Sequence, residues 1–491
     1  MSTVPLPDKP SVERLRKEAR ALQRGARAGD PEAVALAGAH GVVEDPAGLR
    51  LSSAQLVVAR RYGFASWPAL RRYVDVVERY RWDPDAPEDG GEAAADRFCR
   101  LACLWYQDDR PGRRDEARAL LAAHPTLPGA SIWAAAAASD RPATEHWLAG
   151  DASLARTRGG PFGWCPLFYL AYSRLDDGVS AEAALGTARL LLDAGADPNE
   201  GYLWRGLPTP FTLLTGAFGH GELGPENQPP HPHSIALARL LLDAGADPND
   251  GQALYNRMFE ADDDHLELLL EYGLGRGEGG PWKARLGPEL ASPTAMLQDQ
   301  LDWAVSHDQA ARVALLVEHG ASVNQRDGDG HTPAEVAALG GSAEIADYLM
   351  GRGAPPLRLR GVDALVAALM GGDRGRVGSF DEGSIASLRS ERPWLIVWAT
   401  ARGRLEGVRL LLELGWDVNA FGRGDVPSPM RWQTALHTAA GEGHIGLVEL
   451  LLAAGADPNL RDNRFEGTAL SWARHFGQEE AIRLLAPVTS A

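Results

Sequence analysis

The sequence predicts an all-α fold, a helical solenoid of about ten repeats preceded by a small helical module. Two recurring strings predict it. The first, ARLLLDAGADPN, occurs at residues 188–199 and again at 238–249. Weaker copies of it lie at 312–324, 408–419 and 448–459. A second string lies between the copies, at 330–341, 433–444 and 467–478. Such alternation is typical of a chain built by stacking one supersecondary unit many times.

The first string predicts a short amphipathic helix that ends at a glycine. Its leucines recur at helical spacing, and the Asp-Pro-Asn that often follows has the composition of a turn. A helix C-terminus favours a residue in the left-handed conformation, which glycine adopts without steric cost. We therefore expect positive φ angles at Gly195, Gly245, Gly320, Gly415 and Gly455.

The second string predicts another helix, with its N-terminus marked by threonine. Thr332, Thr434 and Thr468 occupy positions suited to an N-cap, and Pro333 follows at the first helical position. Paired small residues such as Ala439 and Ala440 allow neighbouring helices to approach closely. Each unit is therefore expected to hold a threonine-capped first helix and a glycine-terminated second helix.

The order T-P-L-H-x-A-A followed by L-L-L-x-x-G-A-D-x-N resembles the ankyrin repeat. The resemblance covers residues 97–487 unevenly, with loops inserted at 219–234 and 421–433. It implies a concave groove lined by first helices and turns, and binding of another protein or peptide there. It also implies that His437, at the family's histidine position, ties its turn and has a structural role.

The first 80 residues predict a separate helical module. The segment 51–74 resembles a small module found ahead of ankyrin arrays in bacteria, and Gln55 with the run 62–68 carries the likeness. Residues 81–96, rich in Asp, Glu, Pro and Gly, are expected to form a linker. The chain as a whole therefore resembles a bacterial ankyrin repeat domain-containing protein.

Charge limits the class of partner. The net charge is −17, yet residues 1–80 hold 13 Lys and Arg against 9 Asp and Glu, a balance of +4, so the remainder carries −21. A strongly acidic array repels phosphate backbones, so we expect no nucleic acid partner. The basic N-terminal segment could contact an acidic partner or the acidic array itself.

Composition also bears on location. Three cysteines, Cys99, Cys103 and Cys165, do not make a disulfide framework. The N-terminal sequence has no apolar signal core, and no stretch approaches the ~20 apolar residues that cross a bilayer. We expect a cytoplasmic protein that does not bind membranes. Three lysines against 46 arginines indicate a GC-rich bacterial genome.

Helical periodicity locates the residues that should face the groove. Counting the threonine of each first helix as position one, position five lies opposite the core-facing positions, and positions eight and nine flank it. The expected partner-binding residues are Tyr169, Tyr172, Trp303, His307, Trp398, Arg402, Trp472 and His475. An aromatic stripe beside Arg and His is typical of a binding surface. The alternative is that these aromatic side chains fill volume beneath the inserted loops.

A second hypothesis is a small-molecule or metal site, with or without catalysis, closed by the 219–234 loop. Its residues are Trp164, Trp204, Phe218, His220, Glu222, His231 and His233. The His and Glu residues are capable of binding metals, but their spacing matches no helix-borne metal signature. The run 263–267 fits a D-D-x-x-E pattern, but we interpret it as carboxylates that complement the dipole at a helix N-terminus. We predict no catalytic residue and no cofactor.

Overall fold

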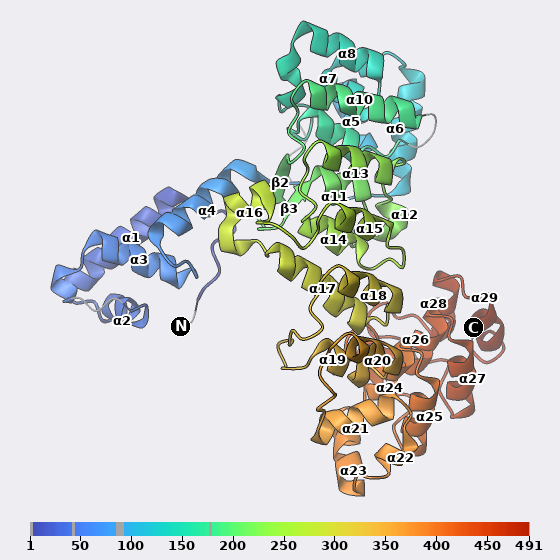
Figure 1. Ribbon diagram of the computed structural model, residues 1–491. Helices are drawn as coiled ribbons and strands as arrows, with labels where there is room; N and C mark the ends of the chain where they lie inside the picture. Colours follow the sequence, from blue (N-terminus) through green and yellow to red (C-terminus); the bar gives the residue numbers. More distant parts are fainter. Residues whose placement is uncertain (1–2, 42–44, 85–92, 176–178, 491) are drawn as a thin grey trace. The chain divides into compact units, whose positions relative to one another are not determined.

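The computed structural model describes residues 3–41, 45–84, 93–175 and 179–490. Residues 85–92, inside the expected linker 81–96, lie outside the described residues. The chain divides into two compact units, Met1–Leu297 and Gln298–Ala491, here called unit 1 and unit 2. The described residues are mostly helical, so the predicted all-α helical solenoid is confirmed (Figure 1).

The helices of unit 1 begin with four in the N-terminal module: α1 (Val12–Arg27), α2 (Pro31–Ala39), α3 (Leu51–Arg61) and α4 (Trp67–Tyr80). The remaining helices are α5 (Ala94–Ala102), α6 (Pro111–Ala123), α7 (Ile132–Ala137), α8 (Arg141–Gly150), α9 (Pro166–Tyr172), α10 (Ala181–Asp193), α11 (Leu213–Phe218), α12 (Gly224–Asn227), α13 (Ser234–Asp243), α14 (Gly251–Arg257), α15 (Asp264–Glu271) and α16 (Gly280–Leu286). Short strands are β1 (Arg81–Trp82), β2 (Gly201–Trp204) and β3 (Pro210–Thr212).

Unit 2 continues the pattern from helix α17 (Pro293–Ser306), which begins in the last residues of unit 1. The others are α18 (Ala310–Glu318), α19 (Pro333–Leu339), α20 (Ala343–Gly351), α21 (Gly361–Met370), α22 (Arg374–Val377), α23 (Glu382–Glu391), α24 (Leu395–Ala401), α25 (Leu405–Glu413), α26 (Ala435–Gly441), α27 (Ile445–Ala453), α28 (Ala469–His475) and α29 (Glu479–Leu485). Strands β4 (Phe421–Gly422) and β5 (Gln433–Thr434) form an antiparallel hairpin.

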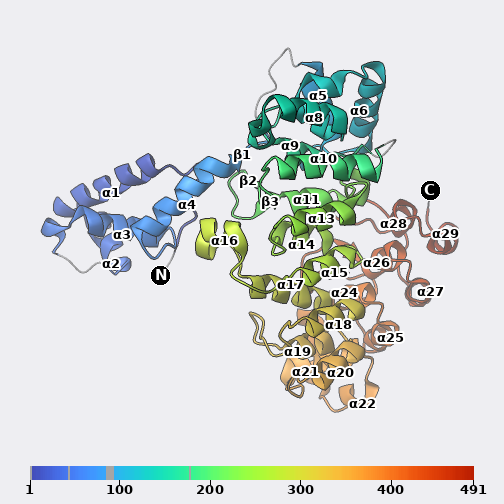
Figure 2. The ribbon, with the colours of Figure 1, turned by 45° about the horizontal axis from the view of Figure 1, so that its top comes forward.

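Helix pairs stack in rows in both units. In unit 1 the first helices α5, α7, α9, α11 and α14 pack in chain order, and α8, α10, α13 and α15 form a second row. In unit 2, α24, α26 and α28 form the first row, with α25, α27 and α29 beside them (Figure 2). Within each unit, every helix pair therefore buries its faces against the neighbouring pairs.

The expected helix boundaries are confirmed where the strings predicted them. The Thr332 hydroxyl accepts a hydrogen bond from the Glu335 amide, and the Glu335 carboxylate accepts one from the Thr332 amide. The Thr468 hydroxyl caps α28 by accepting a hydrogen bond from the Ser471 amide. All five predicted glycines have positive φ, from +84° at Gly415 to +99° at Gly320.

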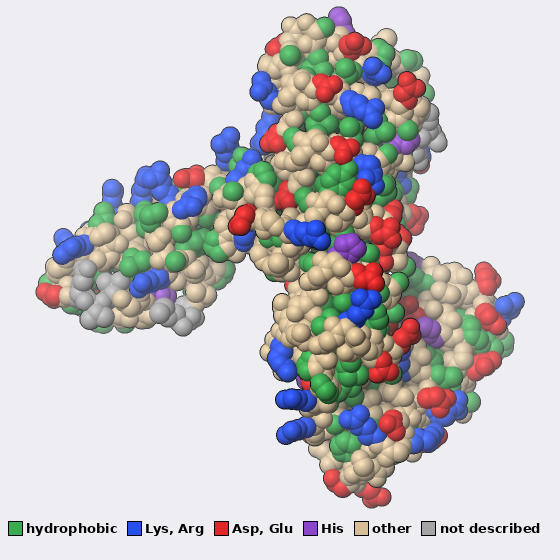
Figure 3. Space-filling view, in the orientation of Figure 1, with side chains coloured by type: hydrophobic (Ala, Val, Ile, Leu, Met, Phe, Trp, Pro, Cys, Tyr) green, Lys and Arg blue, Asp and Glu red, His purple; other side chains and the backbone are tan. Residues whose placement is uncertain are grey.

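The N-terminal module is held together by an apolar stripe. Helix α1 buries Leu15, Ala19, Leu22 and Ala26 and packs on α2, α3 and α4. Its outer face is basic, and the charged side chains visible on the module in Figure 3 are mainly Lys and Arg. The first residues of the expected linker form a strand, because β1 pairs in parallel with β2.

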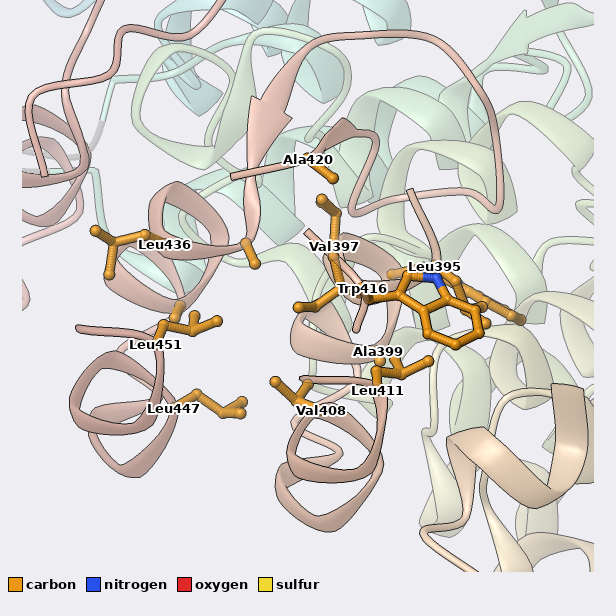
Figure 4. Packing of buried hydrophobic residues seen from close by; sticks show 14 of the residues in the cluster. Leu395, Val397, Ala399, Val408, Leu411, Trp416, Ala420, Leu436, Leu447 and Leu451 are labelled. Carbon is orange, nitrogen blue, oxygen red and sulfur yellow. The ribbon is translucent and has the colours of Figure 1, made fainter. Parts of the chain in front are cut away.

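The core of unit 2 fills the space between its two helix rows. Leu395, Val397 and Leu411 are fully buried, and Trp416 closes the same cluster (Figure 4). The Trp416 indole N–H donates to the Arg392 carbonyl at 3.1 Å, so its polar atom is satisfied. Burying each such aliphatic side chain contributes roughly 1.5–3 kcal/mol to folding. No described helix is long and apolar enough to cross a membrane.

Candidate functional site

Two of the expected partner-binding residues lie inside unit 1. Tyr169 and Tyr172, both on α9, are fully buried. The Tyr169 hydroxyl donates to the Gly159 carbonyl and accepts from the Phe162 amide, both at 2.9 Å. The Tyr172 hydroxyl donates to the Thr212 carbonyl at 2.8 Å. Burial raises the pKa of both phenols well above the usual value. Neither tyrosine is therefore accessible to a partner on the surface.

An aromatic cluster covers these tyrosines. Trp164, on the loop before α9, lies with its ring 5.5 Å from Tyr169 and 5.2 Å from Tyr172. Trp82, on β1, contacts both Trp164 and Trp204, with ring centroids 5.6 and 5.5 Å away. The strand that follows the N-terminal module therefore helps to fill the face of α9 that periodicity places in the groove. In unit 1 these aromatic side chains therefore fill volume in the interior and do not line an open groove.

The inserted loop 219–234 is fastened to the helices before it. Arg174 is fully buried, and its guanidinium donates to the carbonyls of Pro229 and Gly216, each at 2.6 Å. Gln228 donates to the Asp109 carboxylate at 3.0 Å. A side chain at Gly219 would place its Cβ 2.4 Å from the Pro229 carbonyl oxygen, so the loop needs glycine there. The loop acts as a brace across the repeats.

The imidazoles of this loop bond to nearby protein groups. His231 Nδ1 accepts from the His233 amide at 3.0 Å, and His233 Nε2 donates to the Val179 carbonyl at 2.9 Å. His220 Nδ1 lies 3.3 Å from the Glu260 carboxylate. Burial lowers the pKa of His220 and of His231. The hydrogen bonds of His231 and His233 give these two imidazoles a structural role in the loop.

The other residues of the hypothetical ligand site lie in different surroundings. Phe218 is fully buried, and its ring lies 5.9 Å from that of His265. Glu222 is exposed and accepts from the Tyr255 hydroxyl at 3.3 Å. Among the residues the structure describes, no three metal ligands from the 219–234 loop lie within 4.8 Å of one another.

One group of possible metal ligands occurs in the described ranges: Asp262, Asp264 and His265. Arg257 lies among them, since its guanidinium donates to Asp264 at 2.8 Å and also pairs with Asp262. The pKa of Asp264 is strongly lowered, chiefly by its hydrogen bond with His265. The Arg257 guanidinium therefore already neutralises the two carboxylates that would otherwise bind a metal ion.

Four expected partner-binding residues come together in unit 2. Trp303 and His307 stack along α17, with ring centroids 3.6 Å apart and planes inclined by 16°. His307 Nδ1 donates to the Trp303 carbonyl at 2.9 Å. Burial lowers the pKa of His307, and the positive charge of Arg402 adds to this. The pair therefore presents a neutral imidazole on an indole face.

Asp308 links this stack to residues far along the chain. Its carboxylate accepts from Arg404 at 2.6 Å and from Arg402 at 3.4 Å. Arg404 also donates to the Gly340 carbonyl at 2.8 Å, so the C-terminal ends of α17, α19 and α24 lie close together. The Arg402 guanidinium lies 5.9 Å from the Trp398 ring centroid. We call Trp303, His307, Asp308, Trp398, Arg402 and Arg404 the first-helix cluster.

Trp398 is the least accessible member of this cluster, with 8% of its surface exposed. Its indole N–H is buried and has no hydrogen-bond partner. The inserted loop 421–433 lies nearby, since a Cβ at Gly424 would be 3.2 Å from Ala401 and 3.3 Å from Thr438. This loop therefore covers part of the face of α24 and α26.

The last repeat carries the remaining two expected residues. Trp472 is half-buried, and its indole N–H donates to the Asp462 carboxylate at 3.0 Å. His475 is exposed, as is its neighbour Phe476, whose ring lies 6.2 Å from Trp472. His437 holds its turn as expected, since Nδ1 accepts from Thr434 and Nε2 donates to the Gly467 carbonyl at 3.0 Å. This end of unit 2 therefore presents an apolar surface.

Several residues of these sites were not predicted from the sequence. Arg174 and Asp308 each gather contacts from positions 40 or more residues away, which a periodicity argument cannot register. Trp432, in the loop before β5, and Phe465, on the turn before α28, lie outside the helical positions that were counted. A signal did exist for Trp432, because it falls within the inserted loop singled out as unusual.

Sequence comparison identifies the repeat type in this part of the chain. Residues 396–490 match the sequence model of ankyrin repeats, with three copies. The matched segment runs from α24 to α29, where the paired rows are most regular. This segment therefore contains ankyrin repeats, which are generally protein-interaction modules.

Similar segments occur in animal proteins. A 73-residue segment, 15% of this chain, is 44% identical to Palmitoyltransferase Hip14 of Drosophila melanogaster and covers 10% of that protein. An 86-residue segment, 17% of this chain, is 40% identical to Protein phosphatase 1 regulatory subunit 12A of Mus musculus, and the Rattus norvegicus protein is 38% identical; each match covers 8% of the relative. The chain thus spans a tenth or less of these relatives, and the bacterial origin stays a prediction.

Proposed function

We propose that this protein is an interaction scaffold that binds a partner protein or peptide along the first helices of unit 2, in an aromatic-lined concave groove. The observation that carries the proposal is the first-helix cluster, in which Trp303, His307 and Arg402 lie close to one another at the helix ends. Aromatic and arginine side chains dominate the binding energy of protein interfaces. Trp472 and His475 extend the same face into the last repeat. The excess of arginine over lysine supports a bacterial source for the protein.

The test is partner capture with matched variants. Tagged full-length protein is cross-linked in its source cells, and captured proteins are quantified by mass spectrometry. The variant W303A/W472A removes two half-buried indoles from the proposed face, and L207A removes an exposed apolar side chain from unit 1. We expect at least a tenfold loss of the captured partner for W303A/W472A, since each indole truncation costs about 2 kcal/mol at an interface hot spot.

Folding is monitored in parallel, because a misfolded variant would also lose its partner. Circular dichroism and thermal unfolding should remain close to wild type for both variants. Equal capture by wild type and W303A/W472A, with both folded, would overturn the proposal.

A further inference from the structure

The insertion 421–433 and the last turn of the array form one continuous surface. The Asn463 amide donates to the Trp432 carbonyl at 2.8 Å, and the Asn463 side chain donates to the Arg431 carbonyl at 2.9 Å. Asp462 fastens this turn to the first-helix face, since it accepts from the Trp472 indole. We call Arg423, Met430, Arg431, Trp432, Arg464 and Phe465 the paired-finger surface.

Arginines of this surface are stacked on aromatic rings. The guanidinium groups of Arg423 and Arg464 lie over the Trp432 ring, 3.9 and 4.5 Å from its centroid. Arg464 also lies 5.0 Å from the Phe465 centroid, and Arg431 lies 5.3 Å from that of Phe421. Stacking occupies the face of a guanidinium and leaves the N–H groups on its edge able to donate. Arg423 donates a hydrogen bond from its Nε to the Asp425 carboxylate at 2.7 Å.

Arg431 and Arg464 have no carboxylate partner among the described residues. Some exposed arginines of the second helices are paired: Arg239 donates to Glu271 at 2.7 and 2.8 Å, and Arg352 to Glu318 at 2.9 Å. Two guanidiniums without a carboxylate partner in the described part of the chain therefore lie on one surface of a protein whose net charge is −17.

Apolar side chains are exposed between these arginines. Phe465 is 67% exposed and Met430 is 48% exposed. Arginine, aromatic residues and methionine are the types enriched at protein interfaces, whereas Lys, Glu and Asp are depleted there. A guanidinium fork matches a carboxylate with two parallel hydrogen bonds.

We propose that the paired-finger surface binds an acidic segment of a partner protein, in which carboxylates flank an apolar side chain. The carboxylates pair with Arg431 and Arg464, and the apolar side chain packs on Phe465 and Met430. This inference rests on the proposed function of unit 2 as a partner-binding unit, and it names the chemistry of the partner.

The test is selection from a random dodecapeptide display library on the folded full-length chain, followed by fluorescence anisotropy with the enriched peptides. We expect enriched peptides to be net acidic with a central apolar residue. The variant R431E/R464E should weaken their binding at least about tenfold, since a hydrogen-bonded charge pair is worth more than a factor of ten. R360E/R483E changes the net charge equally at exposed arginines elsewhere in unit 2 and should bind as wild type.

Two further variants separate this inference from the groove. R431K/R464K keeps the charge but loses the planar fork, and it should bind less tightly than wild type. W303A should retain most of the peptide affinity, because Trp303 belongs to the first-helix cluster and lies outside the paired-finger surface. Loss of binding in W303A but not in R431E/R464E would overturn the inference and leave the groove standing. Enrichment of neutral or basic peptides, or no enrichment, would also overturn it.

Discussion

The two units differ in how they place the aromatic residue at position five of a first helix. This residue is Tyr169 in unit 1 and Trp303, Trp398 or Trp472 in unit 2, where Trp398 is also buried. Tyr169 is covered by Phe162 and Trp164, which belong to the loop preceding its own helix. Trp303 and Trp472 stay half-buried beside polar side chains. The contrast teaches that the loops, and not the helix register alone, decide whether an aromatic residue can meet a partner.

The substitution expected to destabilise the protein most is at Trp164, in the aromatic cluster of unit 1. W164A should destabilise unit 1 by about 3–5 kcal/mol, because it leaves a large cavity among packed rings. F476A, at an exposed ring of unit 2, should change stability by less than about 0.5 kcal/mol. Thermal and chemical unfolding of the full chain measure both. Similar losses for the two variants would contradict the assigned environments.

The next largest loss of stability is expected at Arg174, which holds the 219–234 loop in place. R174A leaves the buried carbonyls of Gly216 and Pro229 without their donors, which should cost about 2–3 kcal/mol. Burial lowers the pKa of this guanidinium to about 10, so the side chain is charged at neutral pH. Hydrogen exchange should speed up at the amides of His220 and His231. The exposed R189A serves as the matched control, and equal protection in R174A would show that the brace does not depend on this residue.

The sequence predicts the local features of this fold but not its long-range contacts. The caps at Thr332 and Thr468 and the left-handed glycines are local features, and they were predictable because each is decided within one turn of helix. Trp164 covers Tyr169 and itself packs on Trp82, which lies 87 positions before Tyr169 in the chain. The first-helix cluster depends on Asp308 and Arg404, which lie 96 residues apart. No spacing rule within one repeat can register contacts of that range.

His437 should make the stability of unit 2 depend on pH. Its folded-state pKa lies below 6.5 because of burial, so the unfolded chain takes up the proton first. The stability that His437 contributes is therefore complete above pH 6.5 and is lost as pH falls from 6.5 toward the folded-state pKa. The slope for one such group is at most about 1.4 kcal/mol per pH unit. Hydrogen exchange of the α26 amides should show this slope, and H437N should reduce it; an unchanged slope would show that other groups titrate.

The smallest effect is expected at Asp308. D308N removes the charge that Arg402 and Arg404 share, yet all three side chains retain solvent contact. The loss of stability should be about 0.5–1 kcal/mol and should shrink as salt is added. Urea unfolding at low and high ionic strength measures it. A loss of several kcal/mol that salt does not change would mean that the cluster is sealed from water.

Oxidative footprinting of the intact protein, read by mass spectrometry, tests most directly the contrast on which this account depends. At one radical dose, Phe465, Trp472, His475 and Phe476 of unit 2 should be modified readily, whereas Trp164, Tyr169 and Tyr172 of unit 1 should stay unmodified. Comparable modification of the two sets would contradict the account, because it would mean that the loops of unit 1 do not cover its aromatic residues.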